Sequence, residues 1–110
     1  MPWAWSFALS GNAALNFLDS VYMDKVFLSV TGLDAERGAT SLETDEALVY
    51  RKMLKQAKQV IVVADASKLG KVSPAIICAI SDIHILITDT GATAEATAPF
   101  ERAGTRVIRV

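Results

Sequence analysis

Apolar residues gather along the chain in short continuous runs, and four of these runs predict β-strands. Each run is rich in β-branched residues and is bounded by polar or glycine-containing segments, as strands usually are. The four runs span residues 25–31, 59–64, 83–88 and 105–110. The second contains Val60-Ile-Val-Val63, and such hydrophobicity without alternation is typical of a parallel strand covered on both faces.

A fifth apolar segment, residues 74–80, is compatible with two structures. Ser73 and Pro74 could start a helix, because proline is favoured in the first helical turn. The three isoleucines of the segment favour a strand instead. The residues alone leave both interpretations open, and the strand is preferred.

Helical periodicity predicts three helices between the strands. Ser10 can cap the first, which is expected to run to about Tyr22. The second ends near Lys58, with acidic residues in its first turn and lysines near its end, as the helix dipole favours. The third covers part of residues 91–103, and Pro99 is expected to break or restart it.

The start of the second helix has two candidate caps. Thr40 and Glu43 are spaced as in a capping box, while Thr44 could be the cap instead. The preceding residues 32–41 carry two glycines and several polar side chains, so they are predicted to be a loop.

The order of these elements, α-β-α-β-β-β-α-β, predicts an α/β fold with a mostly parallel sheet and helices on its faces. A single domain over residues 1–110 suits the length. Such a sheet usually has more strands than this sequence supplies. We therefore expect either a further segment in a longer relative or an oligomer that covers the exposed faces.

Composition and charge narrow the classes of partner. Hydrophobic residues make up 52% and charged residues 21%, so the chain can bury a packed core. The net charge of −1 gives neither a basic face for nucleic acid nor a polybasic membrane patch. The start lacks the positive region of a secretory signal, and no apolar run reaches membrane-spanning length. A soluble, cytoplasmic protein is expected.

Two residues that often carry chemistry are interpreted here as structural. The single cysteine, Cys78, lies in an apolar run and fits a small core residue in a reducing compartment. His84 has no cysteine or second histidine to complete a metal site and is interpreted as a core or edge histidine. No Walker loop, dinucleotide fingerprint or zinc spacing is present, so no cofactor or metal is predicted.

Polar residues follow three of the predicted strands, where ligands bind in open α/β sheets. They supply carboxylates, one lysine and backbone amides, a set that suits a polyhydroxylated anion such as a sugar phosphate. The residues are Gly32, Asp34, Gly38 and Thr40 after the first strand, Asp65, Ser67, Lys68 and Gly70 after the second, and Thr88, Asp89 and Gly91 after the third.

Each of these residues also has a purely structural interpretation. Asp65 can close a turn by bonding its own backbone. Lys68 can be a solvated surface lysine, and Glu46 can be a first-turn partner of the helix dipole. Asp89 can cap a turn or a helix. Spacing alone leaves these alternatives open.

Several dispersed motifs, in the same order and register, resemble the C-terminal sensor domain of DeoR-type transcriptional repressors. The resemblance extends from about residue 8 to residue 110. The motifs are Asp24-Lys-Val-Phe-Leu-Ser-Val-Thr-Gly-Leu-Asp34, Gly38-Ala-Thr40, Glu46-Ala-Leu-Val49, Val62-Val-Ala-Asp-Ala-Ser-Lys68-Leu-Gly70 and Leu86-Ile-Thr-Asp89.

The resemblance implies a regulatory role. Such repressors join a DNA-binding winged helix-turn-helix to a sensor that binds a phosphorylated sugar or related metabolite and weakens operator binding. The sensor fold is Rossmann-like, with three layers, and is similar to ribose 5-phosphate isomerase. By this comparison the chain is N-terminally truncated, without the DNA-binding domain and the first, phosphate-loop part of the sensor. DNA would be reached only through that absent domain, and self-association into a homo-oligomer is implied.

The same resemblance implies effector-binding roles for Asp34, Thr40, Glu46, Asp65 and Lys68. In the related isomerases a glutamate at the position of Glu46 is the general base, and a lysine at that of Lys68 lies on the phosphate side or orients the substrate. Residues 31–34 keep only the second aspartate of the enzyme motif, and residues 36–40 lack its lysine. Proton transfer needs both a base and stabilisation of the enediolate, so binding without turnover is expected.

Three functions follow, in order of preference. The first is the effector-sensing part of a DeoR-type regulator. The second is a small isomerase-like enzyme that uses Glu46 as its base. The third is a truncated product that acts only in oligomerisation.

Overall fold

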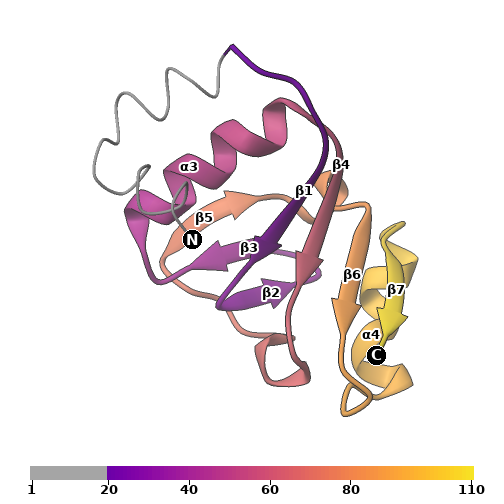
Figure 1. The fold of residues 1–110 in the computed structure, drawn as a ribbon. Coiled ribbons are helices and arrows are strands. Elements are labelled where there is room, and N and C mark those ends of the chain that lie inside the picture. Colours follow the sequence, from indigo (N-terminus) through magenta and orange to yellow (C-terminus); the bar gives the residue numbers. More distant parts are fainter. Residues whose placement is uncertain (1–19) are drawn as a thin grey trace.

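The computed structural model describes residues 20–110 (Figure 1). Most of the helix predicted over residues 10–22 lies outside this range. Its last three residues form a turn and an extended approach to the first strand rather than helix.

A four-stranded parallel sheet forms the centre of the molecule. Its strands lie in the order β1-β4-β6-β7, and every neighbouring pair is parallel (Figure 1). The bounds are Met23–Ser29 for β1, Ala57–Val63 for β4, Ile85–Thr88 for β6 and Arg106–Arg109 for β7. The predicted α/β class with a mostly parallel sheet is confirmed. Each of the four apolar runs overlaps one of these strands, although β1 and β4 begin two residues before their runs.

A second, antiparallel sheet has the strand order β2-β3-β5, with bounds Gly32–Asp34, Gly38–Ser41 and Ala75–Cys78. The loop predicted over residues 32–41 is wrong, because most of it forms the β2–β3 hairpin. These strands are too short and too rich in small and polar residues to show periodicity. The strand interpretation of residues 74–80 is confirmed by β5, and a short 3-10 helix, η2 (Ile80–Asp82), follows it.

Helix α3 (Thr44–Lys55) starts differently from the capping-box prediction. Thr40 lies in β3, so it cannot cap the helix, and Thr44 is already the first helical residue. The cap position belongs to Glu43, whose side chain makes no capping bond. Instead its backbone N–H donates to the hydroxyl of Ser41 (3.0 Å).

Helix α4 (Ala94–Arg102) continues through Pro99, so the expected break at that residue is wrong. Thr93 caps the helix, since its hydroxyl accepts from the N–H of Ala96 (3.0 Å). The proline leaves one carbonyl of the first turn without its helical donor, which a short, partly exposed helix tolerates.

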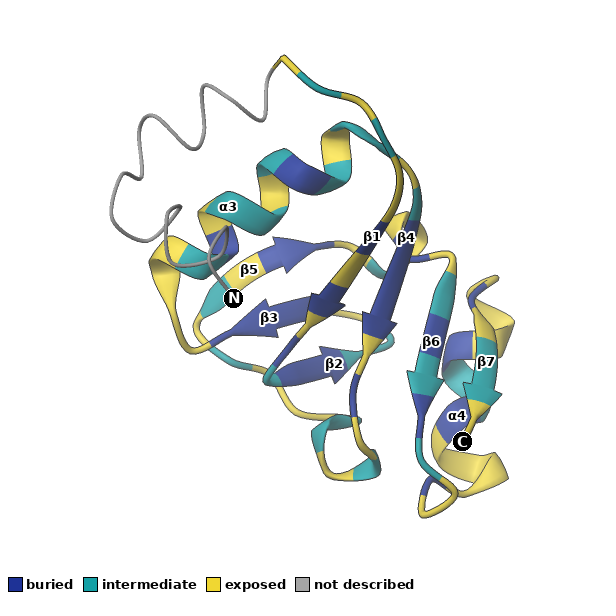
Figure 2. Cartoon of the chain, viewed as in Figure 1, coloured by how far each residue is buried: buried dark blue, intermediate teal, exposed yellow. Residues whose placement is uncertain are grey.

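Both helices pack on the same face of the parallel sheet. Ala47 and Met53 of α3 and Phe100 of α4 join one buried cluster, which also holds Leu28 and Leu86 from the strands (Figure 2). This cluster positions the polar loops that follow the strands.

Candidate functional site

Because the four strands are parallel, their carboxyl ends meet at one edge of the sheet (Figure 1). Three polar segments follow at this edge. They are the β2–β3 hairpin after β1, the short 3-10 helix η1 (Ala66–Lys68) after β4, and the turn between β6 and α4. Ligands of open α/β sheets bind in this position.

Asp65 closes the turn after β4. Its Oδ1 accepts hydrogen bonds from the backbone N–H and the hydroxyl of Ser67. The hydroxyl bond and the backbone bond, in that order, lower the pKa of Asp65 below its usual value. The exposed carboxylate is thus held ionised at the start of η1, and Lys68 lies half-buried at the end of that helix.

The segment after Lys68 is pinned to the β2–β3 hairpin. The N–H of Gly70 donates to the carbonyl oxygen of Leu33 (2.7 Å), and Leu33 and Leu69 form a parallel bridge. Gly32 permits this approach, because a Cβ there would lie 2.6 Å from the carbonyl oxygen of Lys71.

A second attachment lies a few residues further along. The backbone N–H of Ser73 donates to the hydroxyl of Thr40 (2.8 Å), and the hydroxyls of Ser73 and Thr31 share a hydrogen bond of 2.8 Å. The hairpin and the segment that follows η1 are therefore joined at two points, through Leu69–Gly70 and through Ser73. We call these two segments, residues 31–41 and 65–73, the edge unit.

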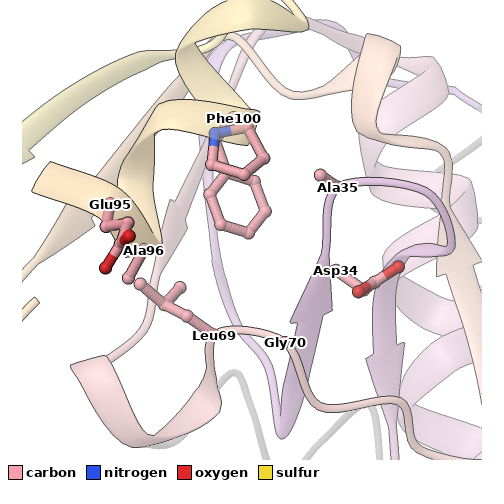
Figure 3. A pocket seen from close by; sticks show the side chains of 8 residues that line it. Asp34, Ala35, Leu69, Gly70, Glu95, Ala96 and Phe100 are labelled. Atoms are coloured by element: carbon pink, nitrogen blue, oxygen red, sulfur yellow. The ribbon is translucent and has the colours of Figure 1, made fainter. Parts of the chain in front are cut away.

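Asp34 lies where the edge unit faces α4. Its Oδ2 accepts from the N–H groups of Glu36 (3.0 Å) and Arg37 (2.9 Å), which closes the hairpin turn. A cleft of about 200 Å³ separates the edge unit from α4 (Figure 3). Its lining is apolar with two carboxylates, from Asp34, Ala35, Leu69, Gly70, Glu95, Ala96, Pro99 and Phe100.

Figure 3 shows the ring of Phe100 projecting between α4 and the hairpin, opposite Ala35. The Asp34 carboxylate points away from the ring, toward the hairpin turn. The lining of the cleft is thus mainly apolar, with the carboxylate of Asp34 on its hairpin side and that of Glu95 on its α4 side.

Asp89 connects two of the three segments at this edge. Its Oδ1 accepts from the N–H of Gly91 (2.9 Å), and its Oδ2 accepts from the N–H of Ala66 at the start of η1 (3.3 Å). The preceding residue, Thr88, is only 2% exposed, and its hydroxyl has no hydrogen-bond partner.

The structure places the five predicted effector-binding residues in different surroundings. Asp34 lines the cleft, while Asp65 and Lys68 lie on the turn of the edge unit just before the lining residues Leu69 and Gly70. Thr40 is 1% exposed and bonds within the edge unit. Glu46 lies in the first turn of α3, where it accepts from the hydroxyl of Ser41 (3.1 Å).

Glu46 also affects Tyr50, one turn further along α3. Burial raises the pKa of the Tyr50 hydroxyl, and the charge of Glu46 raises it further, while a backbone hydrogen bond at Ser29 opposes both. Neither Thr40 nor Glu46 is among the residues that line the cleft.

Comparison with known proteins identifies the domain. The family model described as the DeoR C terminal sensor domain matches residues 4–90. The chain belongs to this family. The identification agrees with the motifs that end β1, β4 and β6 and supply the edge unit.

Curated relatives of this DeoR sensor domain are named as regulators. The HTH-type transcriptional regulator FruR of Bacillus subtilis is 42% identical over 82 residues, which are 74% of this chain and 33% of FruR. GlpR of Haloferax volcanii is 36% identical over 101 residues, 92% of this chain and 40% of GlpR. A putative aga operon transcriptional repressor of Escherichia coli O157:H7 is 35% identical over 100 residues, 91% and 37% of the two chains. The DeoR sensor domain described here spans two fifths or less of each relative.

Sequence reasoning missed the α4 wall of the DeoR sensor cleft. Glu95 and Phe100 come from a helix whose extent was uncertain because of Pro99, and an apolar wall leaves no motif. The one usable signal was the order of the strands, since right-handed connections place α4 on the same side of the sheet as the hairpin.

The two residues interpreted as structural do have structural roles in this DeoR sensor domain. The N–H of Val60 donates to Nδ1 of His84 (2.9 Å), so His84, which is exposed and directly precedes β6, is a hydrogen-bonded histidine beside β4. Cys78 is buried, and burial raises the pKa of its thiol to about 11. Within residues 20–110, no three His, Cys, Asp or Glu side chains are grouped to hold a metal ion. Neither described helix is long and apolar enough to cross a membrane.

Proposed function

We propose that this chain is the effector-sensing part of a DeoR-type transcriptional regulator. Its effector is a phosphorylated sugar or related metabolite, which binds at the carboxyl edge beside the cleft. Binding controls DNA affinity through a winged helix-turn-helix domain that lies outside the 110 residues. The chain acts as one domain, the latter part of the sensor, in the cytoplasm and as a homo-oligomer.

One observation carries the proposal: the edge unit brings Asp34 and the Lys68 turn together beside one cleft. Sugar hydroxyls donate to carboxylates, and Asp34 offers one that two backbone N–H groups hold in place. The ammonium of Lys68 supplies the charge that a phosphate needs. The apolar lining around Phe100 suits the carbon face of a sugar.

The two walls of the cleft suggest how binding is transmitted. One wall is the edge unit, whose two segments are bonded to each other, and the other is α4. An effector that touches both walls stabilises one spacing between them. A ligand shifts such an equilibrium only as far as its affinities for the two states differ.

The proposal is tested by thermal unfolding with a panel of phosphorylated sugars. A bound ligand at about 100-fold excess over its Kd adds about 2.7 kcal/mol to the free energy of unfolding. Lys68→Ala should abolish any shift, whereas Lys71→Ala, which removes an exposed lysine three residues away, should leave it unchanged. The absence of a shift with every member of the panel would contradict effector binding by this chain.

We also propose that the site binds without turnover and uses no cofactor. Glu46, the position of the base in the related isomerases, is held by Ser41 and does not line the cleft. Incubation with aldose phosphates in deuterium oxide should therefore introduce no deuterium at carbon. Uptake that Glu46→Gln abolishes would establish the isomerase-like alternative instead.

A further inference from the structure

The parallel sheet has one apolar face that does not belong to the main core. Strand side chains alternate between two faces, and Leu28, Val62 and Leu86 point into the core in one register row. Their strand neighbours point the other way. We call this opposite surface the outer sheet face, formed by Phe27, Ile61, Val63, Ile85, Ile87 and Ile108. None of these six residues joins the core cluster.

Chain topology explains why the outer sheet face differs from the core face. The strand order β1-β4-β6-β7 means that every connection steps in the same direction across the sheet. Right-handed connections that all step one way lie on one side of the sheet. In the part of the chain that the structure describes, both helices accordingly pack on the core side.

Exposure on this face is high for a parallel sheet. Phe27 is 58% exposed and Val63 is 43% exposed, Ile85, Ile87 and Ile108 are half-buried, and Ile61 in the middle of the face is 5% exposed. Parallel sheets are almost always covered on both faces. A contiguous apolar patch of this kind marks an interaction surface.

Charges at the two ends of the outer sheet face indicate what fits it. Lys25 and Arg106 lie in its register rows at the amino ends of β1 and β7. At the carboxyl edge, Asp65 follows β4 by two residues and Asp89 follows β6 directly. The face therefore has a positive end, an apolar middle and a negative end. A second copy of the chain whose strands run in the opposite direction would set its negative end against the positive end of the first copy. The two apolar middles would then face each other.

We propose that the outer sheet face binds a second copy of this chain, with the two sheets face to face and their strands antiparallel. A twofold axis then sets each strand against its own copy. Lys25 of one copy lies near Asp65 of the other, and Arg106 lies near the other Asp89. Face-to-face sheets pack with about 10 Å between them, at an angle of roughly 30°. This inference names the surface of the proposed oligomer and does not depend on effector binding.

Sedimentation equilibrium of the whole chain without effector tests whether the apolar middle of the outer sheet face is needed for self-association. Val63→Lys places a charge on the outer sheet face and should weaken self-association roughly tenfold or more. The matched control is Val72→Lys, because Val72 is 57% exposed and lies outside the face. This control should associate like the parent chain. A monomeric parent chain, or equal effects of the two substitutions, would overturn the proposal.

A second pair of variants tests the antiparallel arrangement. Lys25→Glu reverses a charge at the positive end of the outer sheet face, so it should weaken self-association. Added salt should also weaken the self-association of the parent chain. The control, Lys55→Glu, makes the same charge change at the exposed end of α3. Equal association constants for the two variants would contradict the antiparallel arrangement. Because these measurements need no ligand, their failure is distinct from failure of effector binding.

Discussion

Three aspartates at the carboxyl edge bond backbone N–H groups a few residues further along or in a neighbouring loop. Asp34 and Asp89 each accept two such hydrogen bonds, and Asp65 accepts one together with a bond from the hydroxyl of Ser67. The sequence left a turn role and a ligand role open for Asp65 and Asp89. The two roles are compatible, because the bonds that close a turn also hold the carboxylate in place, and at Asp65 they lower its pKa.

The Asp65 turn gives a prediction about pKa. Ser67→Ala removes the hydroxyl that contributes most to the lowered pKa of Asp65, so this pKa should rise toward its ordinary value while the backbone bond remains. A pH titration followed by carboxyl carbon NMR measures the change.

The sign of the associated stability change follows from the lowered pKa. A carboxylate whose folded pKa is depressed stabilises the protein above its unfolded pKa, and this contribution disappears as pH falls through the folded value. Ser67→Ala should therefore reduce the acid-dependent part of stability. Ser81→Ala, at an exposed serine elsewhere, is the control and should leave the Asp65 titration unchanged.

Cys78 gives a second prediction at this scale. Burial raises the pKa of its thiol to about 11, so little thiolate forms in mildly alkaline solution. The native chain should react slowly with Ellman's reagent and rapidly once unfolded. Ser81→Cys supplies an exposed thiol for comparison and should react rapidly in the native state. Equally fast reaction of Cys78 in the native parent chain would refute the buried assignment.

Among the helices and strands, those that contain a long or strongly hydrophobic run of residues were the ones that could be predicted from the sequence. The four parallel strands were recognisable because each contains a run of apolar, mostly β-branched or aromatic residues, although β7 has no fully buried residue. The β2–β3 hairpin was not, since Gly38-Ala-Thr-Ser41 has little hydrophobic signal. Its strands exist because tertiary pairing with β5 overrides local propensity.

Gly38 is the residue on which that pairing depends. Its φ is 80°, and a Cβ would lie 2.0 Å from the carbonyl oxygen of Cys78. Gly104 also has a positive φ, of 99°, but a Cβ there would meet nothing within 4 Å. The two glycines separate the effect of backbone strain from the effect of a steric clash.

Alanine substitution at each glycine tests this distinction. Gly104→Ala should lower the free energy of unfolding by about 1–2 kcal/mol through backbone strain alone. Gly38→Ala should lower it by roughly a further 1–3 kcal/mol, because the clash forces β3 and β5 apart. Urea denaturation measures both losses. Equal losses would mean that β3 and β5 separate easily at this point.

For the molecule as a whole, the sequence predicted which edge of the sheet gathers the polar segments but not the full lining of the cleft beside them. Of the five predicted residues only Asp34 lines the cleft, while Asp65 and Lys68 lie on the turn that directly precedes the lining residues Leu69 and Gly70. The wall from α4 could not be predicted, because apolar lining residues have no motif and their position depends on packing across the sheet. The internal roles of Thr40 and Glu46 likewise appear only in the hydrogen-bond pattern.

The position of α4 depends on Arg109 at the end of β7. Its guanidinium donates from Nε to the carbonyl oxygen of Ala92 (3.1 Å) and also to the hydroxyl of Thr97. Arg109→Lys keeps the charge but loses the planar pair of donors. Amide hydrogen exchange in α4 should therefore become faster, as measured by mass spectrometry. Arg106→Lys, at an exposed arginine of the same strand, should leave exchange in α4 unchanged.

The one-directional strand order has a consequence for how the protein folds during its synthesis. Each strand of the parallel sheet after β1 pairs with the strand of that sheet that precedes it in the sequence: β4 with β1, β6 with β4, and β7 with β6. The partner has therefore already been synthesised in each case. Domains begin to fold from the amino-terminal side during synthesis. The sheet can therefore grow strand by strand as the ribosome releases the chain, and none of these four strands has to wait for a later one to insert between existing neighbours.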